Sequence, residues 1–212
     1  MVVPAEVQDL VDNPRETLEV ELKEWLDLSE GINRANTARH LCALANHGGG
    51  YLIFGVRDDL SYVQTAPADL SAYSRDQVSG IVQRYLTPTF QCDVFSAQVS
   101  GNSQQCVVVR VPSHGSVPIC ARSNGPSDGR GRTQGIHEGE HYTRMPGPKS
   151  EPIKSAEHWQ PVIHRCVLSE RQALLESIGR ILGGGELVAR STGTTLSGFH
   201  DAMAKQIKEL LK

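Results

Sequence analysis

The sequence predicts an α+β fold in which a mixed, largely antiparallel sheet is flanked by helices. Short segments alternate between the two-residue period of strands and the 3.6-residue period of helices, and turn residues separate them. The chain of 212 residues is also long enough to bury one substantial core. We expect a main domain over residues 1–182, a linker rich in Gly, Ser and Thr over 183–196, and a C-terminal amphipathic helix over 197–212.

A charged strand and a helix come first in the predicted domain. Between residues 18 and 23 apolar and charged residues alternate, which is the period of a half-buried strand, so Glu21 and Lys23 share its outer face. Over residues 33–45 apolar residues recur every three or four positions, which predicts a helix. The glycines at 48–50 then end this helix.

The remaining elements continue the sheet as a meander. The apolar run over residues 51–56 predicts a buried strand from which Asp58 emerges. The same patterns predict a helix at 75–86, strands at 93–99, 106–111, 119–122 and 142–145, a turn at 146–152, and a helix at 169–182 with Ser169 as its N-cap. Residues 123–140 are rich in glycine and predict a long loop, a kind of segment that often carries function.

Composition indicates the environment in which the protein works. The five cysteines are scattered through apolar surroundings without a C-x-x-C pair, which favours a reducing cytosol. The apolar runs are far shorter than a bilayer span, and the first residues do not resemble a signal peptide. We therefore expect a soluble, cytoplasmic protein without a membrane partner. The pairs His40–Cys42 and His164–Cys166 each resemble one half of a zinc site, but neither has a second pair at finger-like spacing, and buried thiols explain the cysteines better.

The net charge of −3 conceals an uneven distribution along the chain. Residues 1–60 carry eleven acids and five bases, whereas residues 110–154 carry seven bases and four acids. The basic stretch can face phosphates. Its candidate nucleic-acid-binding residues are Arg122, Arg130, Arg132, Arg144 and Lys149. An equally weighted alternative is that these are solvated charges of a glycine-rich loop, because the excess of positive charge is small.

Three carboxylates form the candidate chemical site. Glu16 precedes the first strand, Glu21 lies in it, and Asp58 follows the second predicted strand. If these strands are adjacent, the carboxylates come together, and their oxygens suit Mg²⁺ or Mn²⁺. Such an ion activates water and neutralises a phosphate, while Lys23 can assist at that phosphate. The alternative from the residues alone is a solvated acidic edge.

These carboxylates lie within a pattern that resembles the AlbA domain of Schlafen proteins. Its parts are E-T-L-E-V-E-L-K at 16–23, a helix ending in A-N-H-G-G at 45–49, and G-Y-L-I-F-G-V-R-D at 50–58. Their order and spacing match the family's motifs. A looser similarity extends through Tyr142 and Arg144 to the following helix, so the resemblance covers about the first 180 residues.

The resemblance implies a divalent-metal-dependent endoribonuclease acting on structured RNA such as transfer or ribosomal RNA. In Schlafen nucleases the corresponding carboxylates bind the metal and are catalytic, which assigns these roles to Glu16, Glu21 and Asp58, with Asp59 as a neighbouring substitute. One alternative is a non-catalytic module or regulator that binds DNA or RNA, because many bacterial relatives are described only in those terms. A second alternative is a protein-interaction or dimerisation domain that uses the tail helix.

The chain departs from the family pattern in three ways. Leu60 replaces the usual glycine after the aspartate pair, the loop over 123–140 is long, and a single lobe is present where vertebrate nucleases pair two. The single lobe predicts a homodimer, because two copies can rebuild a groove. The H-E-x-x-H sequence at 137–141 matches the zinc-protease expression, but flanking glycines argue against the helix that such a site needs.

Overall fold

The computed structural model describes residues 3–181. The chain divides into two compact units with a boundary after Val167, inside the last described helix. The helices are α1 (Ala5–Asp12), α2 (Gly31–His47), the 3₁₀ turn η1 (Ser71–Tyr73), α3 (Arg75–Tyr85) and α4 (Ala156–Ile181). The strands are β1 (Val20–Lys23), β2 (Gly50–Phe54), β3 (Leu86–Thr87), β4 (Asp93–Gln98), β5 (Gln105–Val111), β6 (Cys120–Ala121), β7 (Tyr142–Met145) and β8 (Lys149–Pro152).

Four strands form a mixed sheet in the order β1-β2-β5-β4. β1 runs parallel to β2, whereas the β2–β5 and β5–β4 pairs are antiparallel. The parallel pair needs a crossover connection, and α2 supplies it. This arrangement confirms the predicted α+β fold. β3 with β6 and β7 with β8 form two small sheets. The expectation of a turn at 146–152 is wrong for β8, whose polar residues pair with β7 without an apolar pattern.

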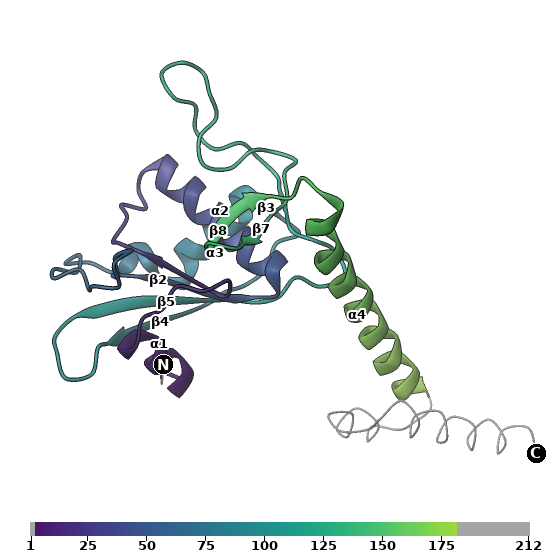
Figure 1. Ribbon diagram of the computed structural model, residues 1–212, viewed down its shortest axis with the longest axis horizontal. Coiled ribbons are helices and arrows are strands. Elements are labelled where there is room, and N and C mark those ends of the chain that lie inside the picture. The colour runs from purple at the N-terminus through teal and green to yellow at the C-terminus, as the bar shows by residue number, and fades with distance from the viewer. Residues whose placement is uncertain (1–2, 182–212) are drawn as a thin grey trace, which may run out of the picture. The chain divides into compact units, whose positions relative to one another are not determined.

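Helices cover both faces of the main sheet (Figure 1). α2 and α3 pack on one face, where Leu52 and Phe54 of β2 join their cluster, and α1 packs on the other, where Ile53 lies. In β1 the apolar Val20 and Leu22 belong to the α1 side. Side chains alternate along a strand, so Glu21 and Lys23 of β1 point toward α2, where Glu21 is buried and Lys23 is partly buried. α1 has no counterpart among the predicted elements, and the assignment of the charged face of β1 to the exterior is therefore wrong.

Glycines 48–50 end α2 and start β2, as predicted. Gly48 adopts a φ of 131°, and its N–H bonds the carbonyls of Leu44 and Ala45. At Gly50 a Cβ atom would lie only 2.2 Å from the carbonyl oxygen of Glu19, because β1 passes directly beside it. A glycine is required here so that β1 and β2 can approach closely enough to pair.

Asn46 joins the end of α2 to two later segments. Its side chain is fully buried, its Nδ2 donates to the carbonyls of Ile119 (2.8 Å) and Tyr142 (2.9 Å), and its Oδ1 accepts from the Ile119 N–H (2.8 Å). One amide thus satisfies three backbone groups that are removed from water. It fixes β6 and β7 against the helix that carries the candidate site.

The last described helix is longer than predicted. α4 is continuous from Ala156, and the Oγ of Ser155 accepts from the His158 N–H at its start. Ser169 therefore lies inside the helix, and its assignment as an N-cap is wrong. The predicted linker and tail helix lie outside the described residues, so those domain limits stay predictions. Among residues 3–181, no helix combines the length and hydropathy needed to cross a membrane.

Replacement of Asn46 by alanine is expected to lower the free energy of unfolding by about 3 kcal/mol, because three buried backbone groups lose their partner. Urea titration followed by far-UV circular dichroism measures the change. Asn13→Ala serves as control, since the side chain of Asn13 makes only an exposed bond to Asp9 and its loss should cost less than about 1 kcal/mol. Equal effects of the two substitutions would contradict this role for Asn46.

Candidate functional site

Glu21 of β1 is the centre of a buried charged cluster. Its side chain is 3% exposed, and both of its oxygens are engaged. Oε1 lies 2.5 Å from Nζ of Lys23 and 3.3 Å from Nδ1 of His40, whereas Oε2 accepts from Nη1 of Arg144. Two cations from different strands therefore compensate the single negative charge of Glu21.

Arg144 of β7 is the fully buried member of this cluster. All five N–H groups of its guanidinium have an acceptor, one of which is Glu21. The other acceptors, at 3.0 to 3.3 Å, are the carbonyl oxygens of Thr17, Leu18 and Val20 and the hydroxyl of Ser150. The predicted assignment of Arg144 to nucleic-acid binding is corrected, because none of its donors is free to reach a phosphate.

His40 of α2 completes the cluster as a neutral group. Burial lowers its pKa well below the usual value, and the positive charges of Lys23, Arg39 and Arg144 lower it further. Its Nδ1 lies 3.0 Å from Oγ of Ser150. The sequence pattern did not indicate this role, since His40 was considered only as part of the pair His40–Cys42.

Glu16 lies within electrostatic range of the buried cluster, and the charges of the cluster affect its pKa. The residue is partly buried, and this burial is the main reason why its pKa is raised. The negative charges of Glu21 and Asp58 raise the pKa further, while the positive charges of Lys23 and Arg144 oppose them. The predicted carboxylates therefore do come within electrostatic range of one another, together with the predicted lysine.

Asp58 and Asp59 have different environments in the turn after β2. Oδ1 of Asp59 accepts from the N–H and the hydroxyl of Ser61, and these bonds lower its pKa. Asp58 is exposed and is the aspartate whose charge acts on Glu16. Leu60, in the position where the family has glycine, adopts a φ of 67°, a left-handed conformation that strains a residue with a side chain.

Of the three carboxylates, Glu21 as placed offers no free oxygen to a divalent ion. An ion needs several free oxygens in one coordination sphere, but both oxygens of Glu21 are bound to cations and a neighbouring histidine. Within residues 3–181, no three His, Cys, Asp or Glu side chains gather closely enough to hold a metal. The geometry therefore supports an electrostatic effect of Glu21 and Asp58 on Glu16.

The glycine-rich loop over 123–140 contains a folded projection, which we call the arginine arm (residues 125–136). Figure 1 shows it as the long loop rising above α2. Its two sides are joined by bonds from Gly125 N–H to the Ile136 carbonyl (2.8 Å) and from Gln134 N–H to the Pro126 carbonyl (2.9 Å). At the tip, Oδ1 of Asp128 accepts from the N–H groups of Arg130 (2.8 Å) and Arg132 (2.9 Å). Both of these arginine side chains are exposed, and Nε of Arg132 also pairs with Oδ2 of Asp128 (3.0 Å), so its charge is partly compensated.

The base of the arginine arm rests on α2. A Cβ atom added at Gly135 would lie 2.8 Å from Cβ of Ala35, so the arm and the helix are in close contact. Nη1 of Arg39 donates to the Gly135 carbonyl (3.3 Å). Arg34 and Arg39 each bury an Nε that has no hydrogen-bond partner within residues 3–181. Neither arginine was predicted as a site residue, because nothing in a helical pattern indicates which loop covers the helix.

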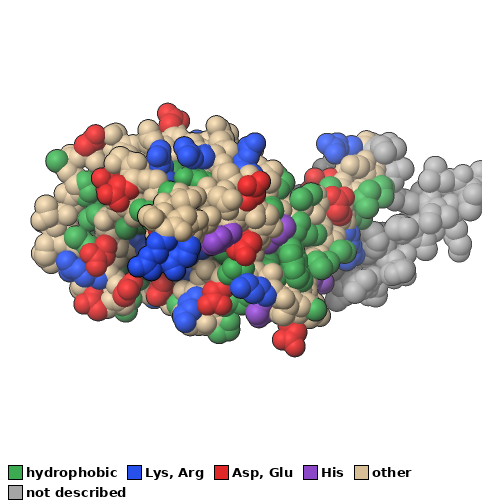
Figure 2. All heavy atoms as spheres, turned by 90° about the horizontal axis from the view of Figure 1, so that it is seen from above, with side chains coloured by type: hydrophobic (Ala, Val, Ile, Leu, Met, Phe, Trp, Pro, Cys, Tyr) green, Lys and Arg blue, Asp and Glu red, His purple; other side chains and the backbone are tan. Residues whose placement is uncertain are grey.

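The other residues predicted to contact nucleic acid differ in their exposure and in their existing hydrogen bonds. Arg122 is exposed and donates from Nη1 to the Gln83 carbonyl (3.0 Å), and Lys149 of β8 is exposed. Arg110, which contributed to the basic stretch, is instead paired with Asp93. Figure 2 shows basic side chains spread over one face with acidic ones between them. On this face the positive charges are therefore separate groups with acidic side chains between them.

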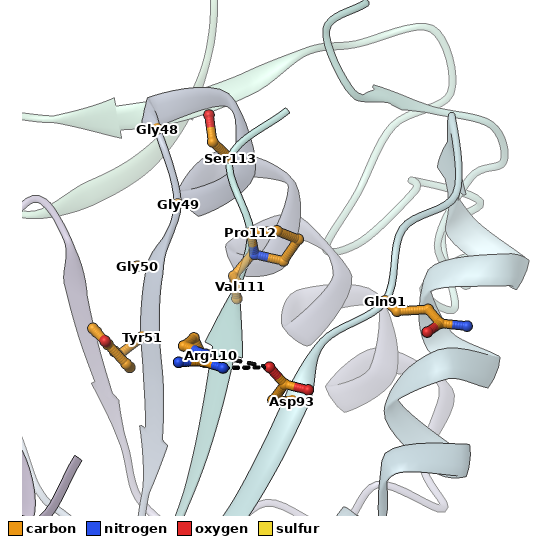
Figure 3. Close-up of a pocket in the computed structure, with 10 residues that line it drawn as sticks. All are labelled: Gly48, Gly49, Gly50, Tyr51, Gln91, Asp93, Arg110, Val111, Pro112 and Ser113. Carbon is orange, nitrogen blue, oxygen red and sulfur yellow. Dashed lines mark hydrogen bonds and ion pairs between the residues drawn. The ribbon is translucent and has the colours of Figure 1, made fainter. Parts of the chain in front are cut away.

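Two surface pockets lie apart from the carboxylates. One, of about 380 Å³, is formed by the glycine turn after α2 and by the ends of β4 and β5 (Figure 3). Its charged pair is Arg110 and Asp93, whose atoms are 2.7 Å apart, so each charge is already compensated. A pocket of about 580 Å³ lies near α1 and also includes Tyr51. Neither lining includes Glu16, Glu21 or Asp58, although Arg15 and Thr17, on either side of Glu16, line the second pocket.

Residues 16–151 match the protein family described as Schlafen, AlbA_2, which confirms the resemblance found in the sequence. No curated protein matches the chain. The DIP2311 protein of Corynebacterium diphtheriae has a similar solved structure, with 19% identity, a TM-score of 0.45, and coverage of 76% of this chain but 25% of that one. The N-terminal domain of a RecG-related protein from Nitrosomonas europaea has 20% identity, a TM-score of 0.39, and coverage of 74% and 98%.

Replacement of Arg144 by methionine is expected to lower the free energy of unfolding by about 3 to 5 kcal/mol, because Glu21 remains buried with less compensation. The double variant Glu21→Leu/Arg144→Met should regain much of this loss, since it removes both charges. Chemical denaturation of the single and double variants measures both effects. Arg122→Met is the matched control on the surface. A loss below about 1 kcal/mol for Arg144→Met would show that the pair is not structural.

Proposed function

Because the chain belongs to the Schlafen AlbA_2 family, a domain commonly associated with nucleic-acid binding, we propose that it binds nucleic acid through the arginine arm and the adjoining part of α2. The observation that carries this proposal is the exposure of Arg130 and Arg132 at the tip of a folded arm whose base lies against α2. Arg39 of α2, which donates to the Gly135 carbonyl at the base of the arm, and Arg34 of the same helix are partly buried and add two further positive charges.

Contacts of this kind suit the nucleic-acid backbone. An arginine fork matches phosphate geometry, and phosphate contacts position a protein without reading bases. The hydrogen bonds that Asp128 accepts from the backbone hold the tip in one conformation, so the loss of conformational entropy on binding is small. Arg122 and Lys149 add exposed charges for a longer ligand. We propose structured RNA of the transfer or ribosomal kind as the ligand, by the family resemblance, with DNA as the alternative.

The variant Arg130→Ala/Arg132→Ala is expected to bind labelled transfer RNA at least about tenfold more weakly than the wild type near physiological salt. Its plot of log affinity against log salt should be shallower by about 0.7 to 0.9 for each phosphate that the variant no longer neutralises. Fluorescence anisotropy across a salt series measures both quantities. A DNA duplex of equal length in the same assay distinguishes RNA from DNA as the preferred ligand.

The matched control is Arg15→Ala/Arg75→Ala, which removes two exposed arginines that pair with Asp9 and Asp93 away from the arm. Its affinity and salt slope should equal those of the wild type. If the wild type binds neither ligand, or if the arm variant and the control bind alike, the proposed interface is wrong.

We propose metal-dependent RNA cleavage with Mg²⁺ or Mn²⁺ as the second candidate function. It is favoured by one arrangement, in which Glu16 is partly buried within electrostatic range of Glu21 and Asp58; burial first, and then these two negative charges, raise the pKa of Glu16. Metal binding would require Lys23 to leave Glu21, and Lys23 is the more exposed of its two cations, at 26% against 0% for Arg144. Glu16 and Asp58, which make no structural ion pair within residues 3–181, would then face the ion.

Cleavage of transfer RNA with Mn²⁺ tests this second candidate. Glu16→Gln and Asp58→Asn should each reduce the rate at least about a hundredfold, because each removes a charge while keeping the shape of the side chain. Glu21 is a poor choice for this test, since its loss disturbs the buried cluster. Glu19→Gln, an exposed neighbour, is the control. No cleavage by the wild type, or equal cleavage by Glu16→Gln, excludes the assignment.

A further inference from the structure

The main sheet has two edge strands, β1 and β4, and outward backbone groups of β1 are already bound. Glu19 and Lys23 accept hydrogen bonds from the chain of β2 and the residues after it. Val20 and Leu22 therefore face outward. The Val20 carbonyl accepts from Nη2 of Arg144 (3.3 Å). The Leu22 carbonyl accepts from Nζ of Lys23 (2.9 Å), so side chains of the same chain occupy this edge.

The outward backbone groups of β4 are largely unbound. The N–H of Val99 donates to the Gln104 carbonyl (2.9 Å) in the hairpin between β4 and β5, which fixes the alternation of the strand. The residues of β4 that face away from β5 are accordingly Val94, Ser96 and Gln98. Within residues 3–181 one hydrogen bond reaches their N–H and C=O groups, from Nε2 of Gln8 to the Gln98 carbonyl (2.9 Å). The other outward groups have no partner in this part of the chain.

The side chains of β4 do not oppose pairing with a further strand. Edge strands that stay unpaired commonly carry charges or prolines that keep other strands away. β4 contains no proline, and its exposed side chains, Ser96 and Gln98, are uncharged. Its single charged residue is Asp93, which pairs with Arg75 (2.8 Å) and Arg110 (2.7 Å). The edge is therefore chemically suited to accept an extended strand.

An antiparallel copy of β4 matches the unbound groups of this edge. About a twofold axis at Ser96, that residue lies opposite Ser96 of the partner subunit, and Val94 lies opposite Gln98 of the partner subunit. Each such pair exchanges two N–H···O=C bonds, so every outward N–H gains an acceptor and the edge is its own complement. The Gln98 carbonyl can accept a second bond because it has two lone pairs. We propose that two copies of this chain pair through their β4 edges to form one continuous sheet.

Sedimentation equilibrium of the full chain at about 1 to 300 µM tests this dimer, which should dissociate on dilution because so short a pairing buries less than the roughly 1,600 Å² of a standard interface. Ser96→Pro should weaken the dimer at least about tenfold, because proline removes an outward donor that the bonds between β4 and β5 do not use. Ser96→Lys keeps the donor and should weaken the dimer about threefold, because two like charges meet at the axis. Ser127→Lys, at an exposed serine of the arginine arm, is the matched control and should dimerise as the wild type does.

Hydrogen exchange distinguishes this dimer from other coverings of the edge. In concentrated wild-type protein the amides of Val94, Ser96 and Gln98 should exchange at least about tenfold more slowly than in dilute protein. The amides of Phe95 and Ala97, which face β5, should be slow at both concentrations. A wild type that stays monomeric, or a dimer that is equally strong in both Ser96 variants and the control, overturns the proposal. Protection of the outward amides at every concentration would show that another segment of the same chain covers the edge, which also overturns it.

Discussion

The ion pair between Glu21 and Arg144 is the contact on which the site region depends. It joins the edge strand β1 to the β7–β8 hairpin, and the same guanidinium binds the turn that carries Glu16 toward the strand. Without Arg144, the carbonyls of this turn would lose their donors and Glu21 would be a buried, poorly compensated charge. The position of Glu16 is thus a product of an arginine that lies far away in the sequence.

This dependence changes the meaning of the acidic motif. A carboxylate that recurs in a metal-binding pattern has a structural function here, because its oxygens are held by Lys23, His40 and Arg144. Glu16 and Asp58 remain accessible, and they are the residues at which charge can act on a ligand. The proposed binding and the proposed chemistry therefore fall on separable sets of side chains, with the arginine arm in one set and these two carboxylates in the other.

Much of the fold could be predicted because its signals are local. The period of β1, the spacing of α2 and the glycines after it depend only on neighbouring residues, and the structure confirms them. The outer face of β1 could not be predicted without α1, which covers the opposite face. Arg144 was assigned to the wrong partner because it lies in a basic stretch of sequence, whereas four of its five acceptors are more than a hundred residues away. Charge counted along a chain does not reveal which charges fold inward.

The long separation between partners also sets an order of events during synthesis. The carbonyl partners of Asn46 are synthesised 73 and 96 residues after it, and the guanidinium partner of Glu21 is synthesised 123 residues after it. Until β7 has left the ribosome, Arg144 is not available, and a nascent chain that buried β1 would bury the carboxylate of Glu21 without this partner. The edge of the sheet that holds β1 is therefore expected to close last, although its residues are among the first to be made.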